Sequence, residues 1–387
     1  MGIHDLFSTL RKKCPQVIHH MSQSNLKGIS VAVDISVFFN VFIRSADPNS
    51  ITVNAWLPGF IDFLISFKKN KISPIFIFDG LEVPDEKREE QQRRRDAVNK
   101  AKDNLVKGQE LMPLIEKYRD QGELPPEDII ASLREVIGPN RAQVLETDFS
   151  DIYSITPSLA FALRKIEKQT LPILPQYTTI ARDFIEVLGF DHYLAKGEAE
   201  ALCASMCIEG SVDAVITEDG DVFAYGCPYL LCKWTRGQCD AIALDEILEG
   251  LGLDFNTFRD FCIMSGCDYN HRAKLPPNPK SKPKDGGEPQ PIPVGPTRAL
   301  SLLEEFGFLE EIEDKLWNPE VLNFRRCREL FQPPDTSFLS PPAPRSLDRK
   351  RLKELWKKHS LKETQHNRIL GLWAPREVVV DDSGVEF

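Results

Sequence analysis

Three short apolar runs, rich in β-branched and aromatic residues, each lead into an aspartate. They cover residues 31–34, 75–79 and 215–219 and end at Asp34, Asp79 and Asp219. Continuous apolar runs of this length are typical of strands in a parallel sheet that is covered on both faces. Because ligands bind such sheets at the carboxyl ends of the strands, we expect the three aspartates to meet at one edge.

A cluster of carboxylates at one edge needs a positive partner, because like charges in close contact raise one another's pKa. An aspartate after a strand is often only a helix N-cap, so each residue alone is weak evidence. The recurrence, with two further acidic pairs, favours a site for Mg²⁺, which Mn²⁺ could replace, and a phosphate-bearing substrate. The seven candidates are Asp34, Asp79, Glu198, Glu200, Asp219, Asp221 and Asp268.

The composition does not exclude nucleic acid as that substrate. The formal net charge of the 387-residue chain is −10, whereas domains that bind DNA are often basic. The balance is local, however, because residues 345–376 contain ten Lys or Arg and three Asp or Glu. A carboxylate metal site also lowers the total. The overall sign is therefore a poor guide to the partner.

The cysteines and the hydropathy pattern predict a soluble intracellular protein. The nine cysteines are an odd number and are scattered, which indicates buried thiols in a reducing compartment rather than disulfides. They lack paired CxxC spacing, which disfavours a zinc site. No apolar run approaches the roughly 20 residues of a membrane span, and the amino terminus does not resemble a signal peptide.

The pattern of elements predicts an α/β fold with helical additions. Strands are expected at 30–34, 74–79, 212–218 and 229–234. Helices are expected at 55–68, 84–119, 176–188, 254–268 and 347–358. Proline-rich stretches and shifts of composition divide the chain into five segments, at 1–84, 85–175, 176–253, 254–332 and 333–387. The fourth contains a proline-rich insertion at 276–293.

Six motifs in this order resemble those of the flap endonucleases, the superfamily of structure-specific 5′ nucleases that includes the XPG repair nuclease. They lie at residues 1–3, 33–34, 78–80, 197–201, 217–221 and 266–269. Residues 294–299 are similar to the family's helix-hairpin-helix, and weaker similarity continues through 328–331. The resemblance implies a PIN-like core, with a mostly parallel sheet flanked by helices, from 1–84 and 176–253. It also implies a helical arch with an insertion in 85–175 and a DNA-binding helix-hairpin-helix in 254–332.

The resemblance implies that the seven carboxylates hold two Mg²⁺ ions, so that no Ser, Cys or His nucleophile is required. Asp34, Asp79, Glu198 and Glu200 would favour the first ion, Asp221 and Asp268 the second, and Asp219 would lie near both. Residues two apart on a helix face nearly opposite ways. Either Glu198 therefore precedes the helix that contains Glu200, or one of the two acts through water.

The resemblance also implies contacts with DNA. In the arch, Lys87 (or a neighbour one residue away) and Arg93 would approach the scissile phosphate, although a solvated helix laced with ion pairs also explains this charged stretch. Gly2, Gly295, Thr297 and Arg298 would contact DNA, and K⁺ could bind at the helix-hairpin-helix. The alternative for 295–298 is a plain helix N-terminus with proline in its first turn.

The chain departs from the family in several places. Residues 120–175 form an additional insertion, and Val294 stands where the family has glycine. Asn40 stands where an aromatic residue often stacks on a base, so Phe38, Phe39 or Phe42 either replaces it or belongs to the core. We find neither a long basic tail nor a good sliding-clamp motif, which argues against dependence on a sliding clamp. The expected state is a monomer. Large DNA viruses encode proteins of this kind.

The leading hypothesis is a Mg²⁺-dependent DNA endonuclease that incises 5′ flaps, with 5′→3′ exonuclease activity, in replication or repair. The alternatives are a PIN-type ribonuclease and a non-catalytic scaffold that binds DNA junctions. The expected location is the nucleus, or a cytoplasmic viral factory. The sequence leaves open the preferred structure among flaps, bubbles, nicks and four-way junctions.

Overall fold

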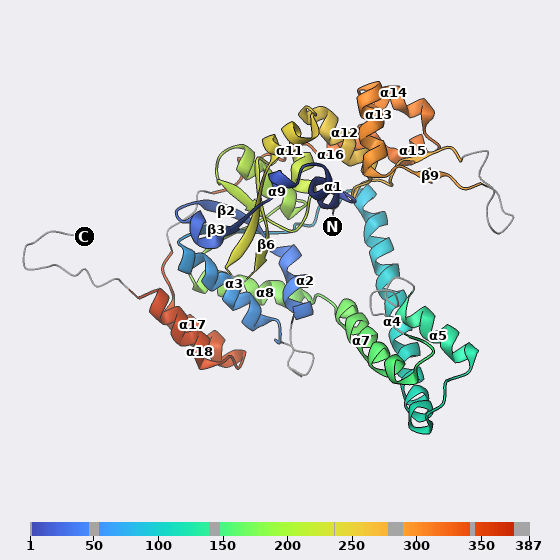
Figure 1. The fold of residues 1–387 in the computed structure, drawn as a ribbon. Coiled ribbons are helices and arrows are strands. Elements are labelled where there is room, and N and C mark those ends of the chain that lie inside the picture. The colour runs from blue at the N-terminus through green and yellow to red at the C-terminus, as the bar shows by residue number, and fades with distance from the viewer. Residues whose placement is uncertain are drawn as a thin grey trace, which may run out of the picture. The chain divides into compact units, whose positions relative to one another are not determined.

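The computed structural model describes residues 2–45, 54–138, 148–235, 237–277, 289–340 and 345–374, and it contains a seven-stranded sheet flanked by helices (Figure 1). The strand order is β1-β7-β6-β5-β2-β3-β4, and β4, β3, β2, β5 and β6 pair in parallel. Strands β7 and β1 extend one edge in antiparallel pairing. The strands are β1 (His19–Ser22), β2 (Ser30–Asp34), β3 (Ser73–Phe78), β4 (Asp191–Leu194), β5 (Ala214–Ile216), β6 (Tyr229–Thr235) and β7 (Gln238–Ala243). The expected mostly parallel sheet is confirmed.

The strands expected from the apolar runs are β2, β3, β5 and β6, and all four are present. Strands β1, β4 and β7 were not predicted. Two of them, β1 and β4, lie at the sheet edges and are polar, so they lack the apolar signal of the central strands.

Both faces of the sheet are covered, because successive side chains of a strand point to opposite sides. On β3, Ile75 and Ile77 belong to the main core, together with residues of α9 (Ala199–Ile208) and α12 (Phe255–Ser265). Phe76 points the other way, and its ring centroid lies 5.7 Å from that of Phe67 on α3 (Leu57–Asn70). The structure therefore buries the strands on both sides, as their continuous apolar sequence predicts.

The other helices that accompany the sheet lie in segments before, between and after its strands. They are α1 (Leu6–Lys13), α2 (Ile35–Ser45), α8 (Pro175–Val187), α10 (Asp221–Tyr225), α11 (Leu244–Leu251), α13 (Pro296–Phe306), α14 (Leu309–Ile312), α15 (Pro319–Leu322), α16 (Phe324–Leu330), α17 (Arg349–Lys358) and α18 (Glu363–Leu372). Short 3-10 turns occur at η1 (Pro15–Val17), η2 (Gln23–Leu26) and η3 (Glu313–Lys315). The helices expected at 55–68, 176–188, 254–268 and 347–358 are present as α3, α8, α12 and α17.

Helix α12, a two-stranded hairpin and helix α13 follow one another in the chain. The hairpin consists of β8 (Lys274–Leu275) and β9 (Ile292–Pro293), which pair antiparallel. The two strands lie at the ends of the proline-rich stretch predicted at 276–293, of which residues 278–288 lie outside the described residues. Residues 294–299 lead into α13, and their identity as a DNA-binding helix-hairpin-helix stays a prediction.

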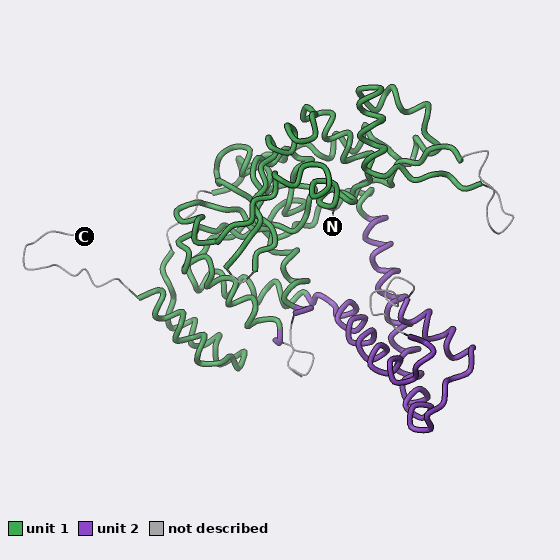
Figure 2. The backbone as a smooth tube through the Cα atoms, viewed as in Figure 1, with its two compact units in different colours: residues 1–42, 56–87, 175–387 green, residues 43–55, 88–174 purple. Residues whose placement is uncertain are grey.

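The chain separates into two compact units (Figure 2). The first unit contains residues 1–42, 56–87 and 175–387, and the second contains 43–55 and 88–174. Helix α4 (Asp85–Gln121) begins in the first unit and continues into the second, where α5 (Glu127–Ile137) and α7 (Ile152–Thr170) lie. The second unit has an apolar core of its own, which includes Leu111, Ile115, Leu133, Val136, Ile155, Leu159 and Ile166.

The structure shows the surroundings of the aromatic residues of α2, of the cysteines and of the basic helix α17. Phe38, Phe39 and Phe42 are buried and pack against other aromatic rings, so they belong to the core. All nine cysteines are buried free thiols, as predicted. Among the described helices, none combines the length and apolarity that crossing a membrane requires. The basic helix α17 buries Trp356, and its Arg351 forms ion pairs with Asp183 and Glu186 of α8.

Candidate metal centre

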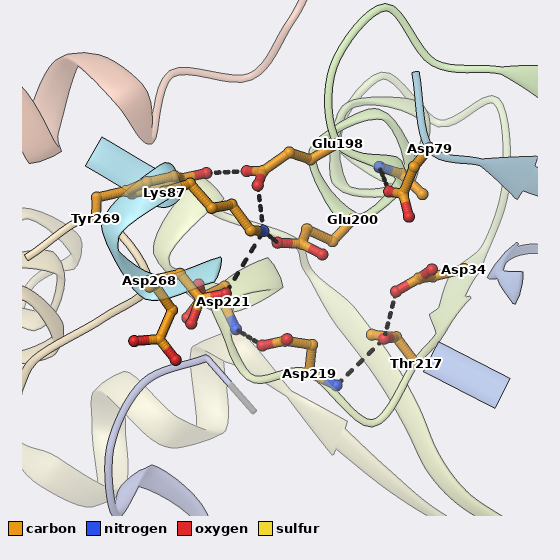
Figure 3. A network of polar contacts seen from close by, with 12 residues as sticks. Asp34, Asp79, Lys87, Glu198, Glu200, Thr217, Asp219, Asp221, Asp268 and Tyr269 are labelled. Carbon is orange, nitrogen blue, oxygen red and sulfur yellow. Dashed lines mark hydrogen bonds and ion pairs between the residues drawn. The ribbon is translucent and has the colours of Figure 1, made fainter. Parts of the chain in front are cut away.

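The carboxyl ends of the parallel strands bring together side chains that are far apart in the sequence. Asp34 is the last residue of β2, Asp79 follows β3, and Asp219 follows β5. Asp221 begins α10, and Asp268 comes three residues after α12. Figure 3 shows these carboxylates in one region of the molecule with Glu198 and Glu200 of the α9 start, and with Lys87 among them. All seven predicted candidates therefore lie at the expected edge of the sheet.

The backbone at the start of α9 explains how the side chains of Glu198 and Glu200 can both point into the carboxylate cluster. Glu198 is the N-cap residue, with extended backbone angles (φ −83°, ψ 137°), and Glu200 lies in the first turn of the helix. Within a regular helix, side chains two residues apart point in nearly opposite directions. Glu198 precedes the regular helix, so this restriction does not hold for Glu198 and Glu200. Asp79 accepts a hydrogen bond from the backbone N–H of Ala199 (2.9 Å), which holds this helix start against the end of β3.

Lys87 joins three of the carboxylates. Its ammonium group forms ion pairs with Glu198, with Glu200 (3.2 Å) and with Asp268 (3.5 Å), and its side chain is 13% exposed. Burial lowers the pKa of Lys87, but attraction by Glu200, Glu198 and Asp268 outweighs burial and raises the pKa overall. Lys87 therefore remains a cation in the centre of the carboxylate cluster.

Hydrogen bonds through Thr217 connect the remaining carboxylates. The Thr217 hydroxyl donates to Asp34 Oδ2 (3.0 Å) and accepts from the backbone N–H of Asp219 (3.2 Å). The backbone N–H of Asp221 in turn donates to Asp219 Oδ1 (3.1 Å). Thr217 thus fixes the ends of β2 and β5 relative to each other. Thr217 belongs to the motif at 217–221, but the sequence alone indicates no role for it.

Two tyrosines hold Glu198 from the other side. The Tyr269 hydroxyl donates to Glu198 Oε2, and the Tyr225 hydroxyl donates to the same oxygen (3.2 Å). The two hydroxyls also contact each other. Neither tyrosine can be singled out from the sequence on chemical grounds, because its role depends on tertiary contact with a glutamate that is 27 residues from Tyr225 and 71 residues from Tyr269.

The electrostatics of the cluster call for additional positive charge. Burial raises the pKa of Asp34 to about 8, and the charge of Asp79 adds to the shift. Burial, with added repulsion from neighbouring carboxylates, also raises the pKa of Asp219 and Asp221. Burial raises the pKa of Glu200 as well, and this outweighs the attraction by Lys87. Within the described residues, neither carboxylate oxygen of Asp221 has a hydrogen-bond partner. Buried, unpaired carboxylate oxygens of this kind suit a hard divalent cation.

As they stand, no three His, Cys, Asp or Glu side chains in the described ranges are arranged to hold a metal ion. The Lys87 ammonium lies among the carboxylates that would have to converge. The ligand type nevertheless suits Mg²⁺, because all seven side chains offer carboxylate oxygens at the carboxyl edge of the sheet. Binding an ion would require these side chains and Lys87 to move from the positions described.

Gly2 packs directly against two of the carboxylates. Its φ is +74°, and a Cβ atom at this position would overlap Asp219 Oδ1 and lie 2.5 Å from Asp221 Oδ1. The resemblance implied a contact between Gly2 and DNA, and that role stays a prediction. What the structure adds is a steric reason for glycine at the edge of the carboxylate cluster.

Gly2→Ala is expected to lower both stability and any activity of this centre. The new methyl group must displace Asp219 or Asp221, and a positive φ costs a non-glycine residue roughly 1–2 kcal/mol. Thermal unfolding, compared with that of Gly28→Ala, separates the two effects. Gly28 also has a positive φ, but a Cβ there meets nothing within 4 Å. Equal losses in the two variants would show that only backbone strain matters at Gly2.

The other predicted residues lie outside the carboxylate cluster. Arg93 belongs to the second unit and forms an ion pair with Glu90 (2.8 Å), as a solvated helix would. Gly295 is the N-cap residue of α13, whose first turn contains Thr297 and Arg298 after Pro296. Val294, at the family's glycine position, is fully buried, and its N–H donates to the Ala273 carbonyl (2.8 Å). DNA contacts by these residues stay predictions.

Comparison with known proteins identifies two family domains. Residues 1–101 match the XPG N-terminal domain and residues 189–268 match the XPG I-region. Flap endonuclease 1 of Meyerozyma guilliermondii is 25% identical over 359 residues, covering 87% of this chain and 79% of the relative. Flap endonuclease 1 of Yarrowia lipolytica is 28% identical over 356 residues, covering 87% of this chain and 78% of the relative.

Solved structures share the fold. The catalytic core of Rad2 in complex with a DNA substrate aligns with a TM-score of 0.61 and 18% identity, covering 96% of this chain and 100% of that one. Flap endonuclease-1 from Methanococcus jannaschii aligns with a TM-score of 0.57 and 18% identity, covering 92% and 95% of the two chains. These similarities extend over both matched domains and the segments between them.

Proposed function

The chain belongs to the flap endonuclease and XPG family, and on that premise we propose that it is a Mg²⁺-dependent, structure-specific DNA endonuclease. The proposed reaction is incision of 5′ flaps at junctions between single-stranded and double-stranded DNA, with 5′→3′ exonuclease activity. The observation that carries the proposal is the meeting of seven carboxylates and Lys87 at the carboxyl edge of a parallel sheet.

The carboxylates fall into groups that suit a pair of ions. We assign Asp34, Asp79, Glu198 and Glu200 to the first ion, Asp221 and Asp268 to the second, and Asp219 to both. When bound, two such ions supply an activated water and stabilise the leaving oxygen. Thr217 fixes the strand ends that carry Asp34 and Asp219, while Tyr225 and Tyr269 orient Glu198. Lys87 supplies a positive charge that attracts the scissile phosphate.

The test is incision of a labelled 5′-flap duplex, with Mg²⁺ and with chelator, next to a flap of matched sequence made of RNA. We expect incision near the junction only with Mg²⁺ and on the DNA flap. Preference for the RNA flap would support the ribonuclease alternative. Tight binding of the flap without incision under any metal condition would support the non-catalytic scaffold.

Arg93→Ala is expected to reduce incision at least tenfold while changing duplex affinity less than threefold. The proposed role of Arg93 is to steer the single strand and to stabilise charge on the phosphate, and removing one such group typically lowers the rate by about 10²–10³. Flap cleavage and duplex binding would be measured together. Arg119→Ala is the control, because Arg119 also pairs with an acidic residue on the exposed surface of α4. Equal losses of cleavage and binding would remove Arg93 from the chemistry.

We infer DNA contacts by Gly2, Gly295, Thr297 and Arg298, and a K⁺ ion held by backbone carbonyls near the start of α13. Backbone N–H groups at a helix N-terminus bind phosphates without reading the base sequence. We further propose that the enzyme acts as a monomer in the nucleus. A duplex bearing the flap is its expected partner.

A further inference from the structure

A cavity of about 430 Å³ adjoins the candidate metal centre, and Glu198 belongs to both. One carboxylate oxygen of Glu198 contacts Lys87 in the metal centre. The other accepts hydrogen bonds from Tyr225 and Tyr269, which line the cavity. The metal centre and the cavity are therefore separated by one carboxylate and its hydrogen-bond partners.

Three stretches of the chain form the wall of this cavity, together with Tyr225 and Tyr269. Residues 82–84 precede α4, residues 195–202 run into the start of α9, and residues 326–338 run from α16 into the segment after it. The first two are joined by backbone hydrogen bonds from Gly80 N–H to the Gly197 carbonyl (2.7 Å) and from Glu82 N–H to the Lys196 carbonyl (3.0 Å). The third is tied to α4 by an ion pair between Arg326 and Glu86 (2.9 Å). The cavity is thus built from segments that are fixed to one another.

The chemistry of the wall suits a neutral, flat, aromatic ligand. Apolar and aromatic residues dominate it, among them Leu202, Leu330 and Phe338. The charged residues of the wall balance, because Glu82 and Glu198 oppose Lys196 and Arg326. Both cations are already engaged: Arg326 pairs with two glutamates, and the Lys196 ammonium lies 4.8 Å from the centroid of the Phe338 ring. A phosphate group would find no free cation among these residues.

We propose that this cavity receives one unpaired nucleobase from a nucleotide next to the scissile phosphate. The proposal rests on the proposed nuclease function and names a further subsite of the same reaction. A base is joined to its phosphate through a single sugar, so a phosphate at the carboxylates can place its base in the adjoining cavity. The volume lies within the usual range of about 300–1,000 Å³ for ligand sites. Enzymes commonly hold an extruded base between apolar and aromatic side chains.

Phe338 is the residue best suited to a test, because 41% of its surface is exposed and its replacement leaves the buried core intact. Phe338→Ala would be compared with wild type on three flaps. The first is intact, the second has an abasic nucleotide on the 5′ side of the scissile phosphate, and the third has one on the 3′ side. Tyr229→Ala is the matched control. It removes an aromatic side chain that is 54% exposed at the start of β6, outside the wall of the cavity.

For wild type we expect an abasic nucleotide at one of the two positions to lower kcat/KM roughly tenfold, as loss of one base stacking contact does. Phe338→Ala should lose a similar factor on the intact flap and little more on the abasic one, because both changes remove the same contact. Tyr229→Ala should behave as wild type. The proposal would be overturned if neither abasic position lowered kcat/KM. It would also be overturned if the loss for Phe338→Ala on the abasic flap equalled the product of the two separate losses.

A second readout does not depend on cleavage. With chelator present, 2-aminopurine is placed in turn at each of the two positions, and at one of them its fluorescence should be quenched when wild type binds the flap and less so with Phe338→Ala. Equal quenching by the two proteins would also overturn the proposal. If wild type bound the flap but never incised it, the proposed function would fail, while the quenching would still decide whether the cavity binds a base.

Discussion

Asp219→Asn is expected to reduce Mg²⁺-dependent incision of a 5′ flap by about a thousandfold or more, while affinity for the flap changes only a few fold. Asparagine keeps the shape of the side chain and the oxygen that accepts the hydrogen bond from Asp221 N–H. It removes the negative charge that we assign to both metal ions. A bound ion contributes several kcal/mol to transition-state stabilisation, and each 1.36 kcal/mol changes the rate tenfold. Incision would be followed with saturating Mg²⁺, and affinity with chelator.

The same variant should not be less stable than wild type when metal is absent. Burial and repulsion by Asp268 raise the pKa of Asp219, so removing its charge relieves an unfavourable interaction. Mg²⁺ should then raise the thermal unfolding temperature of wild type more than that of Asp219→Asn, because a ligand stabilises the folded state more when it binds more tightly. Glu249→Gln, an exposed carboxylate on α11, is the control. Incision by Asp219→Asn at the wild-type rate would remove this residue from the proposed metal site.

The central strands were predictable because their signal is local. Each of β2, β3 and β5 is a continuous apolar run, and the aspartate that follows is part of the same pattern. The convergence of those aspartates follows from parallel pairing alone. The edge strands β1 and β4 are polar, so only pairing with the neighbouring strand reveals them. For Glu198 and Glu200, helical periodicity left two alternatives: either Glu198 precedes the helix, or one of the two glutamates acts through water. The structure selects the first, because Glu198 is the N-cap residue of α9.

Residues whose role depends on distant partners were not predictable in the same way. Thr217, Tyr225 and Tyr269 act by hydrogen bonds to residues of other elements. The burial of Phe38, Phe39 and Phe42 is likewise a property of tertiary packing, so the sequence could not choose between core and base stacking for them. The cavity beside Glu198 depends on three segments that are distant in the chain. The sequence therefore predicts the acidic edge of the sheet better than its surroundings.

Lys87→Met is expected to destabilise the metal-free protein by roughly 3–5 kcal/mol, the usual cost of removing one partner of a buried ion pair. Lys87 is 13% exposed and contacts Glu198, Glu200 and Asp268, which its loss would leave without their cation. Urea unfolding with chelator at neutral pH measures this cost. Saturating Mg²⁺ should reduce it, because bound ions would supply the missing positive charge. Incision should still fall by about 10²–10³, since the metal ions cannot replace the contact that we propose between Lys87 and the scissile phosphate.

Lys107→Met provides the matched control on the same helix. Lys107 pairs with Glu135 (2.5 Å), but its side chain is 38% exposed, and exposed ion pairs contribute only about 0–1 kcal/mol. Lys87→Arg keeps the charge with a different shape and should retain most of the stability but less of the activity. If Lys87→Met proved as stable as wild type in chelator, the lysine would not neutralise the carboxylates. If its stability fell but incision did not, Lys87 would serve the fold of this edge rather than the reaction.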